Sequence, residues 1–214
     1  MKLHTYFRSS AAFRVRMALH LKGLPYEAVP VHLLRGGGEQ HHAAYRQLNP
    51  MAVVPALQDG PQVLTQSLAI IEYLEETHPQ PALLPAHPVE RARVRALAQA
   101  IACDIHPVNN LRVLQYLKGT LRHTQDEVDT WYRHWVMLGL AAVEQLLAGH
   151  PQTGRFCHGD TPGLADCCLL PQVFNARRYQ CALDTLPTLQ RIAAACEAHP
   201  ACVAALPANQ PDAE

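Results

Sequence analysis

Residues 6–19 read YFRSSAAFRVRMAL, and this stretch decides how the chain begins to fold. A short apolar run over residues 3–7 stops at an arginine and two serines, and a helical pattern then begins. A strand that leads into a helix here places free backbone N–H groups and the positive end of the helix dipole beside the serines. Arg8 adds a full positive charge. We therefore interpret Arg8, Ser9 and Ser10 as an anion site, while a serine at this point can also serve only as a helix cap.

The composition is that of a globular, soluble protein. Of the 214 residues, 49% are apolar and 17% are charged. A formal net charge of zero gives no electrostatic case for binding nucleic acid or an anionic membrane. No apolar run approaches the roughly 20 residues of a membrane-spanning helix, and the N-terminus lacks the apolar core of a signal peptide. We expect neither nucleic acid nor a membrane as a partner.

The spacing of the cysteines and histidines indicates the redox compartment and whether a metal site is expected. Seven cysteines are scattered over residues 103–202, and none forms a C-x-x-C pair. This pattern argues against a disulfide framework or a zinc site and favours a reducing compartment. The thirteen histidines lack the H-x-x-x-H spacing of a helical metal site. We expect a cytoplasmic protein without a metal site.

The first 80 residues alternate strand and helix patterns. Gly23, supported by Pro25 just beyond it, ends the first helix. A turn at residues 58–61 joins two short strands into a hairpin. The predicted strands are Leu3–Phe7, Tyr26–His32, Val53–Leu57 and Gln62–Leu64, and the predicted helices are Ser10–Lys22, Glu39–Leu48 and Ser67–Thr77. This order predicts a small mixed sheet with helices packed on it, an α/β domain.

The second part of the chain reads as helical. Residues 78–88 hold four prolines in HPQPALLPAHP, a composition typical of an extended connector. The helices predicted beyond it are Val89–Leu121, Gln125–Ala148, Leu164–Tyr179 and Leu189–His199. The predicted architecture is therefore an α/β domain over residues 1–80, a linker over 81–88 and an all-α domain over 89–214.

Two short motifs in the first part could hold a ligand. Val54-Pro55 stands just before a strand, where the proline either fills the first strand position or forms a cis peptide bond that bends the backbone toward a ligand. Gln66-Ser67 opens a helix, where Ser67 can act as the N-cap and the free N–H groups can hold a carboxylate. Each motif also has a purely structural explanation.

Together, the three motifs and the helical second part resemble the glutathione transferases, whose N-terminal domain is thioredoxin-like. The resemblance spans essentially the whole chain. It implies that Val54-Pro55 is the cis-proline turn that holds the cysteinyl part of glutathione. It also implies that Gln66 and Ser67 hold the γ-glutamyl carboxylate, and that Ser9 or Ser10 faces the sulfur.

The class within this family follows from longer stretches. The opening motif, LNPMAVVPAL, QSLAIIEYLEE and LPQVFNARRY are all similar to the zeta class, whose known members are maleylacetoacetate and maleylpyruvate isomerases. The resemblance implies glutathione as cofactor, a dianionic maleyl-keto acid as substrate and a homodimer. The zeta pattern has a cysteine where this chain has Ala11, so a mixed disulfide cannot form there. Isomerisation remains possible, because glutathione itself supplies the nucleophile.

Several residues are candidates for the substrate and for the second half of the glutathione site. Arg8 and Arg178 are expected to bind the substrate carboxylates, because guanidinium pairs with carboxylate through two hydrogen bonds and keeps its charge. His106 and Asn110 are four residues apart, so on a helix they would share one face beside Arg112 and line the glutathione site. The alternative is a helix kinked by the intervening proline, with a polar pair that is merely satisfied.

Two further patterns are interpreted as structural. Arg14 and Arg16 are expected to form ion pairs on the first helix. Gly163 is expected to cap a later helix, with Asp166 reaching back to its backbone as in a capping box.

Four functions remain open at this point. The leading one is glutathione-dependent isomerisation of maleylacetoacetate in aromatic amino-acid breakdown, and the next is isomerisation of maleylpyruvate in gentisate breakdown. A conjugating transferase without isomerase activity is a third. A non-catalytic glutathione-transferase-like binding module is a fourth, from a different class.

Overall fold

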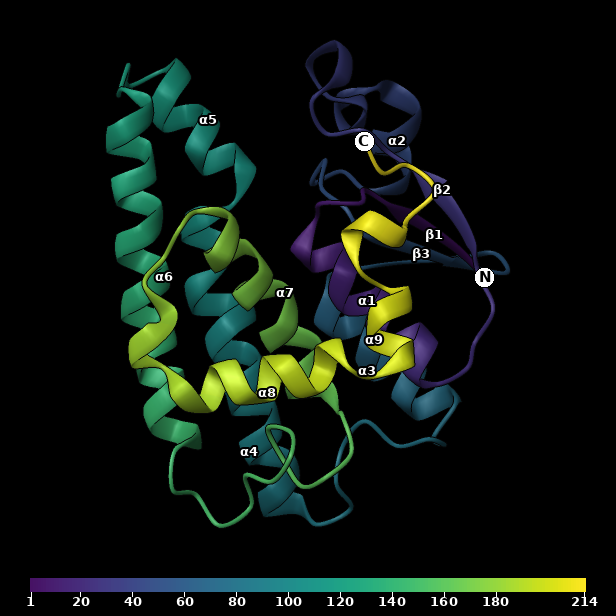
Figure 1. The fold of residues 1–214 in the computed structure, drawn as a ribbon. Helices are drawn as coiled ribbons and strands as arrows, with labels where there is room; N and C mark the ends of the chain where they lie inside the picture. The colour runs from purple at the N-terminus through teal and green to yellow at the C-terminus, as the bar shows by residue number, and fades with distance from the viewer. The chain divides into compact units, whose positions relative to one another are not determined.

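A computed structural model describes all 214 residues, and the chain forms two compact units. The first unit contains residues 1–83 together with 197–214, and the second contains residues 84–196. Figure 1 follows the chain through both. None of the helices combines the length and the apolar character that crossing a membrane requires.

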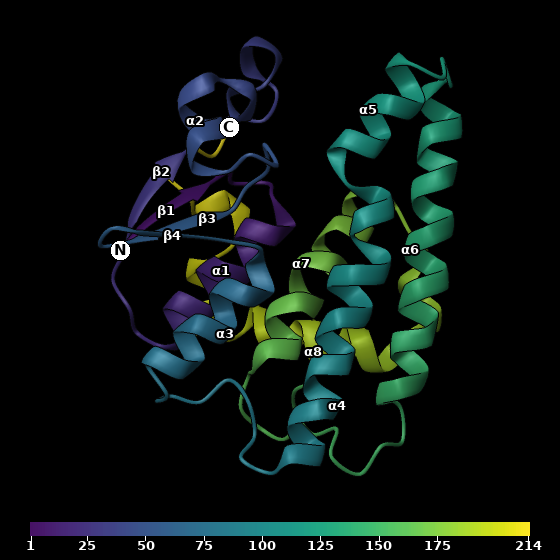
Figure 2. The same ribbon diagram turned by 180° about the vertical axis from the view of Figure 1, so that it is seen from behind.

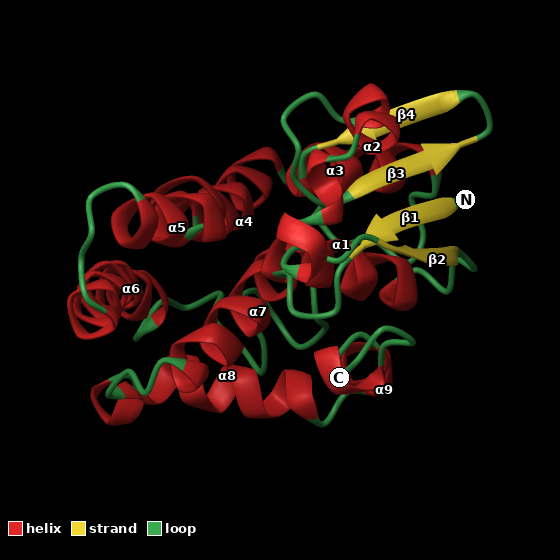
Figure 3. Ribbon diagram, turned by 90° about the horizontal axis from the view of Figure 1, so that it is seen from above, coloured by secondary structure: helices red, strands yellow, loops and turns green.

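The first unit is built on a mixed sheet of four strands in the order β2-β1-β3-β4 (Figure 3). β1 runs parallel to β2 and antiparallel to β3, and β3 and β4 form the predicted antiparallel hairpin. The strands are β1 (Lys2–Thr5), β2 (Glu27–Pro30), β3 (Ala56–Asp59) and β4 (Gln62–Thr65). The thioredoxin-like α/β architecture expected from the sequence is confirmed.

The helices of the first unit are short. They are α1 (Ser10–Leu21), α2 (Ala43–Leu48), α3 (Ser67–Thr77) and α9 (Pro200–Ala204), with 3₁₀ turns at Arg35–Gly37, Glu39–His41 and Pro207–Asn209. α1 packs against both α3 and α9. The prediction of one helix over residues 39–48 is wrong, because His42 has extended backbone and separates the 3₁₀ turn from α2. The α3 prediction is confirmed.

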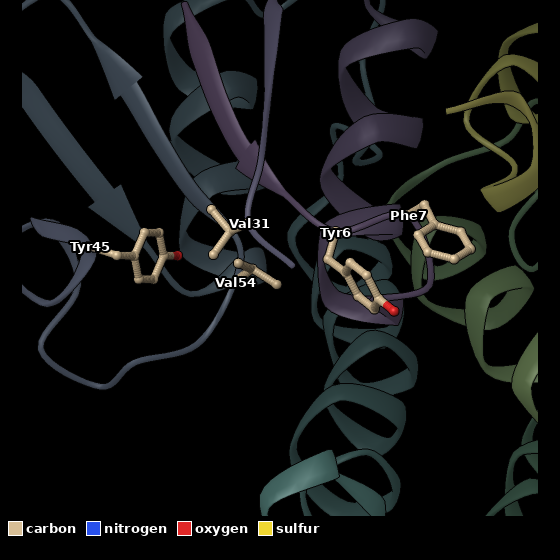
Figure 4. Packing of buried hydrophobic residues seen from close by; sticks show 5 residues of the cluster. All are labelled: Tyr6, Phe7, Val31, Tyr45 and Val54. Carbon is tan, nitrogen blue, oxygen red and sulfur yellow. The ribbon is translucent and has the colours of Figure 1, made fainter. Parts of the chain in front are cut away.

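A small apolar cluster surrounds the C-terminal end of β1. It consists of Tyr6, Phe7, Val31, Tyr45 and Val54, each at most 6% exposed. In Figure 4 the two valines lie between Tyr45 on one side and Tyr6 on the other. Because burying apolar area is the main favourable term in folding, this cluster anchors Tyr6 and Phe7, which directly precede the opening arginine-serine motif.

Arg14 and Arg16 are buried in the first unit, with 2% and 0% of their surface exposed. The expectation that Arg16 forms an ion pair on the first helix is wrong, since its guanidinium donates to the carbonyls of Tyr6, Phe7 and Ala205. Burial lowers the pKa of Arg16 to about 10. Arg14 donates to the Ser67 hydroxyl at 3.2 Å.

A third buried cation, Lys22, fixes the start of the linker. Its Nζ lies 2.7 Å from Glu75 Oε2, and it also donates to the carbonyls of His78 and Pro81 at 2.7 and 2.9 Å. Glu75 in turn accepts from the backbone N–H of Leu83. The ammonium is fully buried and has three acceptors, so burial of the charge is compensated by direct hydrogen bonds.

The second unit contains helices only (Figure 2). They are α4 (Pro88–Gln99), a π-helical turn (Ala100–Ile105), a 3₁₀ turn (Pro107–Asn109), α5 (Leu111–Gly119), α6 (Gln125–Leu147), α7 (Leu164–Arg178), a 3₁₀ turn (Leu183–Thr185) and α8 (Pro187–Glu197). The predicted single helix over residues 89–121 is wrong. Pro107 lacks a backbone N–H, and the helical path changes to π and then to 3₁₀ turns around it.

Two contacts from α6 hold this irregular segment. Trp131 donates its indole N–H to the carbonyl of Val108 at 2.9 Å. Gly139 lies against Ile105, whose side chain occupies the space that a Cβ at position 139 would take. The π-helical turn is therefore seated on α6 by close packing.

The capping box at the start of α7 is confirmed as structural. Asp166 Oδ2 accepts from the backbone N–H of Gly163, and Oδ1 accepts from that of Cys157, both at 2.9 Å. Burial raises the pKa of Asp166, while these two hydrogen bonds act in the opposite direction.

Candidate functional site

The turn between β1 and α1 has the geometry of a capped helix start with a donor left over. Ser9 is the N-cap of α1, and its Oγ accepts from the backbone N–H of Ala12 at 3.2 Å. The capping explanation for one serine is therefore correct. Accepting this bond leaves the hydroxyl hydrogen of Ser9 able to donate. Ser9 is partly exposed, whereas Ser10 is 5% exposed and is the first residue of the helix.

Arg8 lies half-buried beside this turn, and its guanidinium is held by an aromatic pair. Nη2 and Nε donate to the Tyr6 hydroxyl at 2.8 and 3.2 Å, and the guanidinium carbon lies 5.0 Å from the centre of the Phe7 ring. Sequence reasoning missed Tyr6 as a partner of Arg8. Alternation along a strand could not have found it, because Tyr6 to Ser9 form a turn closed by a hydrogen bond from the Ser9 N–H to the Tyr6 carbonyl at 2.9 Å.

The Val54-Pro55 peptide bond is cis, as the resemblance implies. Tyr45 and Asn49 both donate to the carbonyl of Val53 at 2.7 Å and hold the turn from behind. The backbone N–H and C=O of Val54 have no hydrogen-bond partner within the chain. A buried segment with free backbone groups is suited to pairing with the extended backbone of a bound peptide.

The start of α3 differs from the prediction. Gln66, with a φ of 68° and a ψ of 115°, is the N-cap, and its side chain makes no capping hydrogen bond. The interpretation of Ser67 as the N-cap is wrong, because Ser67 is the first helical residue and its Oγ accepts from Arg14 Nη1 at 3.2 Å. Without a side-chain cap, the first N–H groups of α3 remain available to an anion.

The register of the strands brings these three segments to the same end of the sheet. His4 of β1 pairs with Ala56 of β3, and Ala56 pairs in turn with Thr65 of β4. The turns that follow β1, precede β3 and follow β4 therefore leave the sheet at the same end. Arg8-Ser9, Val54-Pro55 and Gln66-Ser67 therefore all lie at this end of the sheet, which the order of the motifs along the sequence alone does not show.

In the second unit, His106 and Asn110 are brought together, but not on one helix face. Their side chains lie 3.3 Å apart between Nε2 and Nδ2. Asn110 has extended backbone and caps α5, where its Oδ1 accepts from the backbone N–H of Arg112 at 3.2 Å. The expected shared face of a continuous helix is wrong because the helix is interrupted at Pro107. Arg112 itself is exposed in the first turn of α5.

Arg178 is exposed at the C-terminal end of α7, and an aromatic stack supports it. Its guanidinium carbon lies 5.5 Å from the centre of the Tyr179 ring. That ring stacks on Tyr132 with centres 3.5 Å apart and an interplanar angle of 11°. Burial raises the pKa of Tyr132, so its hydroxyl stays neutral at physiological pH. The stack restricts where Arg178 can reach while leaving its charge accessible.

Known proteins have a similar sequence and fold. Residues 3–82 match the family model for the glutathione S-transferase N-terminal domain. The chain is 52% identical over 213 residues to the maleylacetoacetate isomerase of Pseudomonas aeruginosa, an alignment that covers 99% of this chain and 98% of the relative.

Two solved structures extend the similarity to the fold. A holo structure of a maleylpyruvate isomerase, described as a bacterial zeta-class glutathione transferase, shares 50% identity, covers both chains completely and superposes with a TM-score of 0.97. The maleylacetoacetate isomerase of Methylobacterium extorquens AM1, with bound malonate and glutathione, shares 40% identity over the whole of both chains, with a TM-score of 0.96. The chain therefore belongs to the zeta class of the glutathione transferase family.

Proposed function

We propose that this protein is a glutathione-dependent cis–trans isomerase that converts maleylacetoacetate to fumarylacetoacetate. The observation that carries the proposal is that one end of the sheet holds Arg8 and Ser9, the free backbone groups of Val54 and the uncapped start of α3. The relatives named above carry this activity or its maleylpyruvate counterpart, and one of them holds glutathione and a dicarboxylate.

The residues at this end of the sheet fit glutathione. The free N–H and C=O of Val54, next to cis-Pro55, suit the peptide backbone of the cysteinyl part. The first N–H groups of α3, at Gln66 and Ser67, suit the γ-glutamyl carboxylate. In the second unit, His106 and Asn110 are our candidates for further contacts with the tripeptide. Bound glutathione supplies a thiolate, which adds reversibly to an activated cis alkene and leaves readily after rotation about the resulting single bond.

The chain's own residues prepare this chemistry. A thiol near neutral pH is mostly protonated, so the site must favour the thiolate. The N-terminus of α1 provides a positive dipole end, and the Ser9 hydroxyl provides a hydrogen that can be donated to the sulfur. Of the two serines we assign this role to Ser9, because Ser9 is partly exposed and Ser10 is buried as the first turn of the helix. Ser10 then supports the turn from within.

The arginines bind the dianionic substrate. We assign one carboxylate to Arg8, whose guanidinium is held by Tyr6, and the other to Arg178, with Arg112 as an additional cation. Guanidinium groups also stabilise the negative charge that develops on the substrate when a nucleophile adds to its double bond. Their charge does not change across the physiological pH range.

The second candidate is maleylpyruvate, because the holo structure at 50% identity is a maleylpyruvate isomerase. The two substrates differ only in the ketone tail, and none of the residues assigned above reads that tail. Ala11 in place of the zeta-class cysteine removes the possibility of a mixed disulfide with glutathione. This favours addition and elimination over thiol redox chemistry.

We further propose that the protein is a cytoplasmic homodimer. Its seven free thiols suit a reducing compartment, and the homodimer follows from the family resemblance. The division into a glutathione-binding domain over residues 1–80 and a helical substrate-site domain over residues 89–214 stays a prediction.

The test is to follow loss of the cis enol absorbance of maleylacetoacetate and of maleylpyruvate, with and without glutathione. Glutathione-dependent turnover of either supports isomerisation, and the ratio of the two rates selects the substrate. No turnover of either would overturn the proposal. Arg8→Ala is expected to raise KM for the dianion more than it weakens glutathione binding, and equal losses would contradict the role of Arg8.

A further inference from the structure

The last residues of the chain return to the first unit. After α8, residues 197–214 belong to the same compact unit as the sheet. They carry α9 and a 3₁₀ turn, and Gln210 ties the end of this segment down by donating to the carbonyls of Ala204 and Leu206, both at 2.9 Å. The segment that follows, residues 211–214, is here called the tail.

The tail makes a direct hydrogen bond to the turn that carries Arg8. The backbone N–H of Phe7 donates to Asp212 Oδ2 at 2.9 Å, across 205 residues of sequence. The other oxygen of this carboxylate, Oδ1, is buried and has no hydrogen-bond partner. Burying a carboxylate oxygen without a hydrogen bond costs stability. Attraction to the buried Arg16 guanidinium, whose pKa the Asp212 charge raises, offsets part of this cost.

Arg16 provides a second connection between the same two segments. Its Nη2 donates to the carbonyl of Phe7 at 3.0 Å, and its Nε donates to the carbonyl of Ala205 at 3.1 Å. Both backbone groups of Phe7 are therefore fixed, the N–H by Asp212 and the C=O by Arg16. Phe7 directly precedes Arg8, and its ring lies under the Arg8 guanidinium.

The end of the tail contacts a residue that packs against Tyr6, the partner of Arg8. Glu214 Oε1 lies 2.9 Å from Arg35 Nη2 and 3.2 Å from His32 Nε2, although the histidine contact is not aligned as a hydrogen bond. The His32 ring packs edge-on against Tyr6 with centres 4.9 Å apart, and Tyr6 holds Arg8. The ion pair between Arg35 and Glu214 is largely exposed and contributes little compared with the bond from Phe7 to Asp212.

We propose that Asp212 is a positioning residue for the proposed isomerase, which fixes the Phe7 backbone so that Arg8 points its guanidinium at the substrate carboxylate. The proposal rests on the function assigned above. Asp212 touches neither substrate nor glutathione in this scheme, and it acts only through Phe7 and Arg8. Its loss should therefore affect binding of the dianion and spare the contacts of glutathione with Val54 and α3.

The experiment compares Asp212→Ala, Asp212→Asn and a control, Asn209→Ala. Alanine removes the acceptor of the Phe7 N–H, whereas asparagine keeps an oxygen at that position. Asn209 is exposed, and its side chain bonds only within the C-terminal segment, to the carbonyl of Val203. All three are assayed for KM and kcat with the maleyl-keto acid, for glutathione affinity, and for hydrogen exchange of the backbone amides over residues 6–9.

Asp212→Ala is expected to raise KM for the dianion by about tenfold, in line with the loss of one buried hydrogen bond, with kcat and glutathione affinity changed far less. Amide exchange should speed up over residues 6–9 only, and Asp212→Asn should restore most of both properties. Unchanged KM and exchange in Asp212→Ala would overturn the proposal. Faster exchange over the whole first unit, or equal losses in Asn209→Ala, would also overturn it, since either would show a merely structural role.

The exchange measurement separates this proposal from the proposed function. If wild-type protein isomerises neither substrate, the function fails, while faster exchange of residues 6–9 in Asp212→Ala still shows that the tail fixes the Arg8 turn. If wild-type protein is active and Asp212→Ala behaves like it, only the positioning role fails.

Discussion

Removal of one oxygen atom, in Tyr6→Phe, is predicted to weaken substrate binding without unfolding the protein. The Tyr6 hydroxyl accepts two hydrogen bonds from the Arg8 guanidinium, at 2.8 and 3.2 Å. Hydrogen bonds to charged groups contribute about 1.5–3 kcal/mol each. Arg8 is half-exposed and water can replace part of this interaction, so we take about 1.4 kcal/mol in total, which corresponds to about a tenfold change in an equilibrium constant.

The assay measures KM and kcat for the maleyl-keto acid at saturating glutathione. The affinity for glutathione is measured separately, without the maleyl-keto acid. We expect KM to rise about tenfold, because Arg8 loses its orientation but keeps its charge and its packing on Phe7. Tyr73→Phe is the matched control. It removes the same atom from the same unit, where the hydroxyl donates to Asp59 Oδ2 at 2.8 Å on the hairpin side of the sheet.

Three results would refute this reasoning. An unchanged KM in Tyr6→Phe would show that the hydroxyl does not orient Arg8 for the substrate. A KM that rises as much in Tyr73→Phe would show that the effect comes from general loosening of the first unit. A loss of glutathione affinity equal to the rise in KM would mean that Arg8 serves the tripeptide rather than the dianion.

Three further predictions concern stability. Lys22→Met removes the ammonium that pairs with the buried Glu75 carboxylate, and it should lower the free energy of unfolding, measured in urea, by about 3–5 kcal/mol. The control Lys2→Met, in an exposed ion pair, should lower it by less than about 1 kcal/mol, and similar losses in both variants would contradict the prediction. Burial, with a smaller effect of a nearby arginine, lowers the pKa of His20 below its usual 6.5, so the unfolded chain binds this proton first as the pH falls. Stability should therefore decrease as the pH falls through about 6.5, and His20→Gln should flatten this dependence in denaturation curves measured from pH 5 to 8. Gly139→Ala should cost about 1–3 kcal/mol, because its Cβ would enter the space that the π-helical turn occupies, and an unchanged melting temperature would contradict that packing.

The fold of the first unit could be predicted largely from periodicity and turn residues. The bounds of α3 and the β3–β4 hairpin follow from strong local patterns, a helical apolar face and a Gly-Pro turn. The break in the helix at Pro107 was foreseen only as an alternative, because a proline removes one hydrogen bond but does not reveal which irregular helical turn replaces it.

Local sequence was enough to propose candidate site residues, but not to predict the contacts that support them. Arg8 and Ser9 stand out locally, because a charged side chain and a cap at a helix start have recognisable chemistry. Burial of Arg16 could not be foreseen, since its main acceptors are backbone carbonyls, including that of Ala205 far along the chain. The bond from Asp212 to Phe7 is equally invisible in sequence, because it depends on where the C-terminal segment returns.

The measurement that tests the central claim most directly is to identify the product and follow glutathione through the reaction by NMR. Purified protein is mixed with maleylacetoacetate, and in parallel with maleylpyruvate, at a glutathione concentration far below that of the substrate. The isomerase mechanism predicts complete conversion of the cis alkene to the trans alkene, with all glutathione recovered unchanged. Absence of glutathione-dependent conversion, or accumulation of a glutathione adduct in proportion to the substrate consumed, would contradict it.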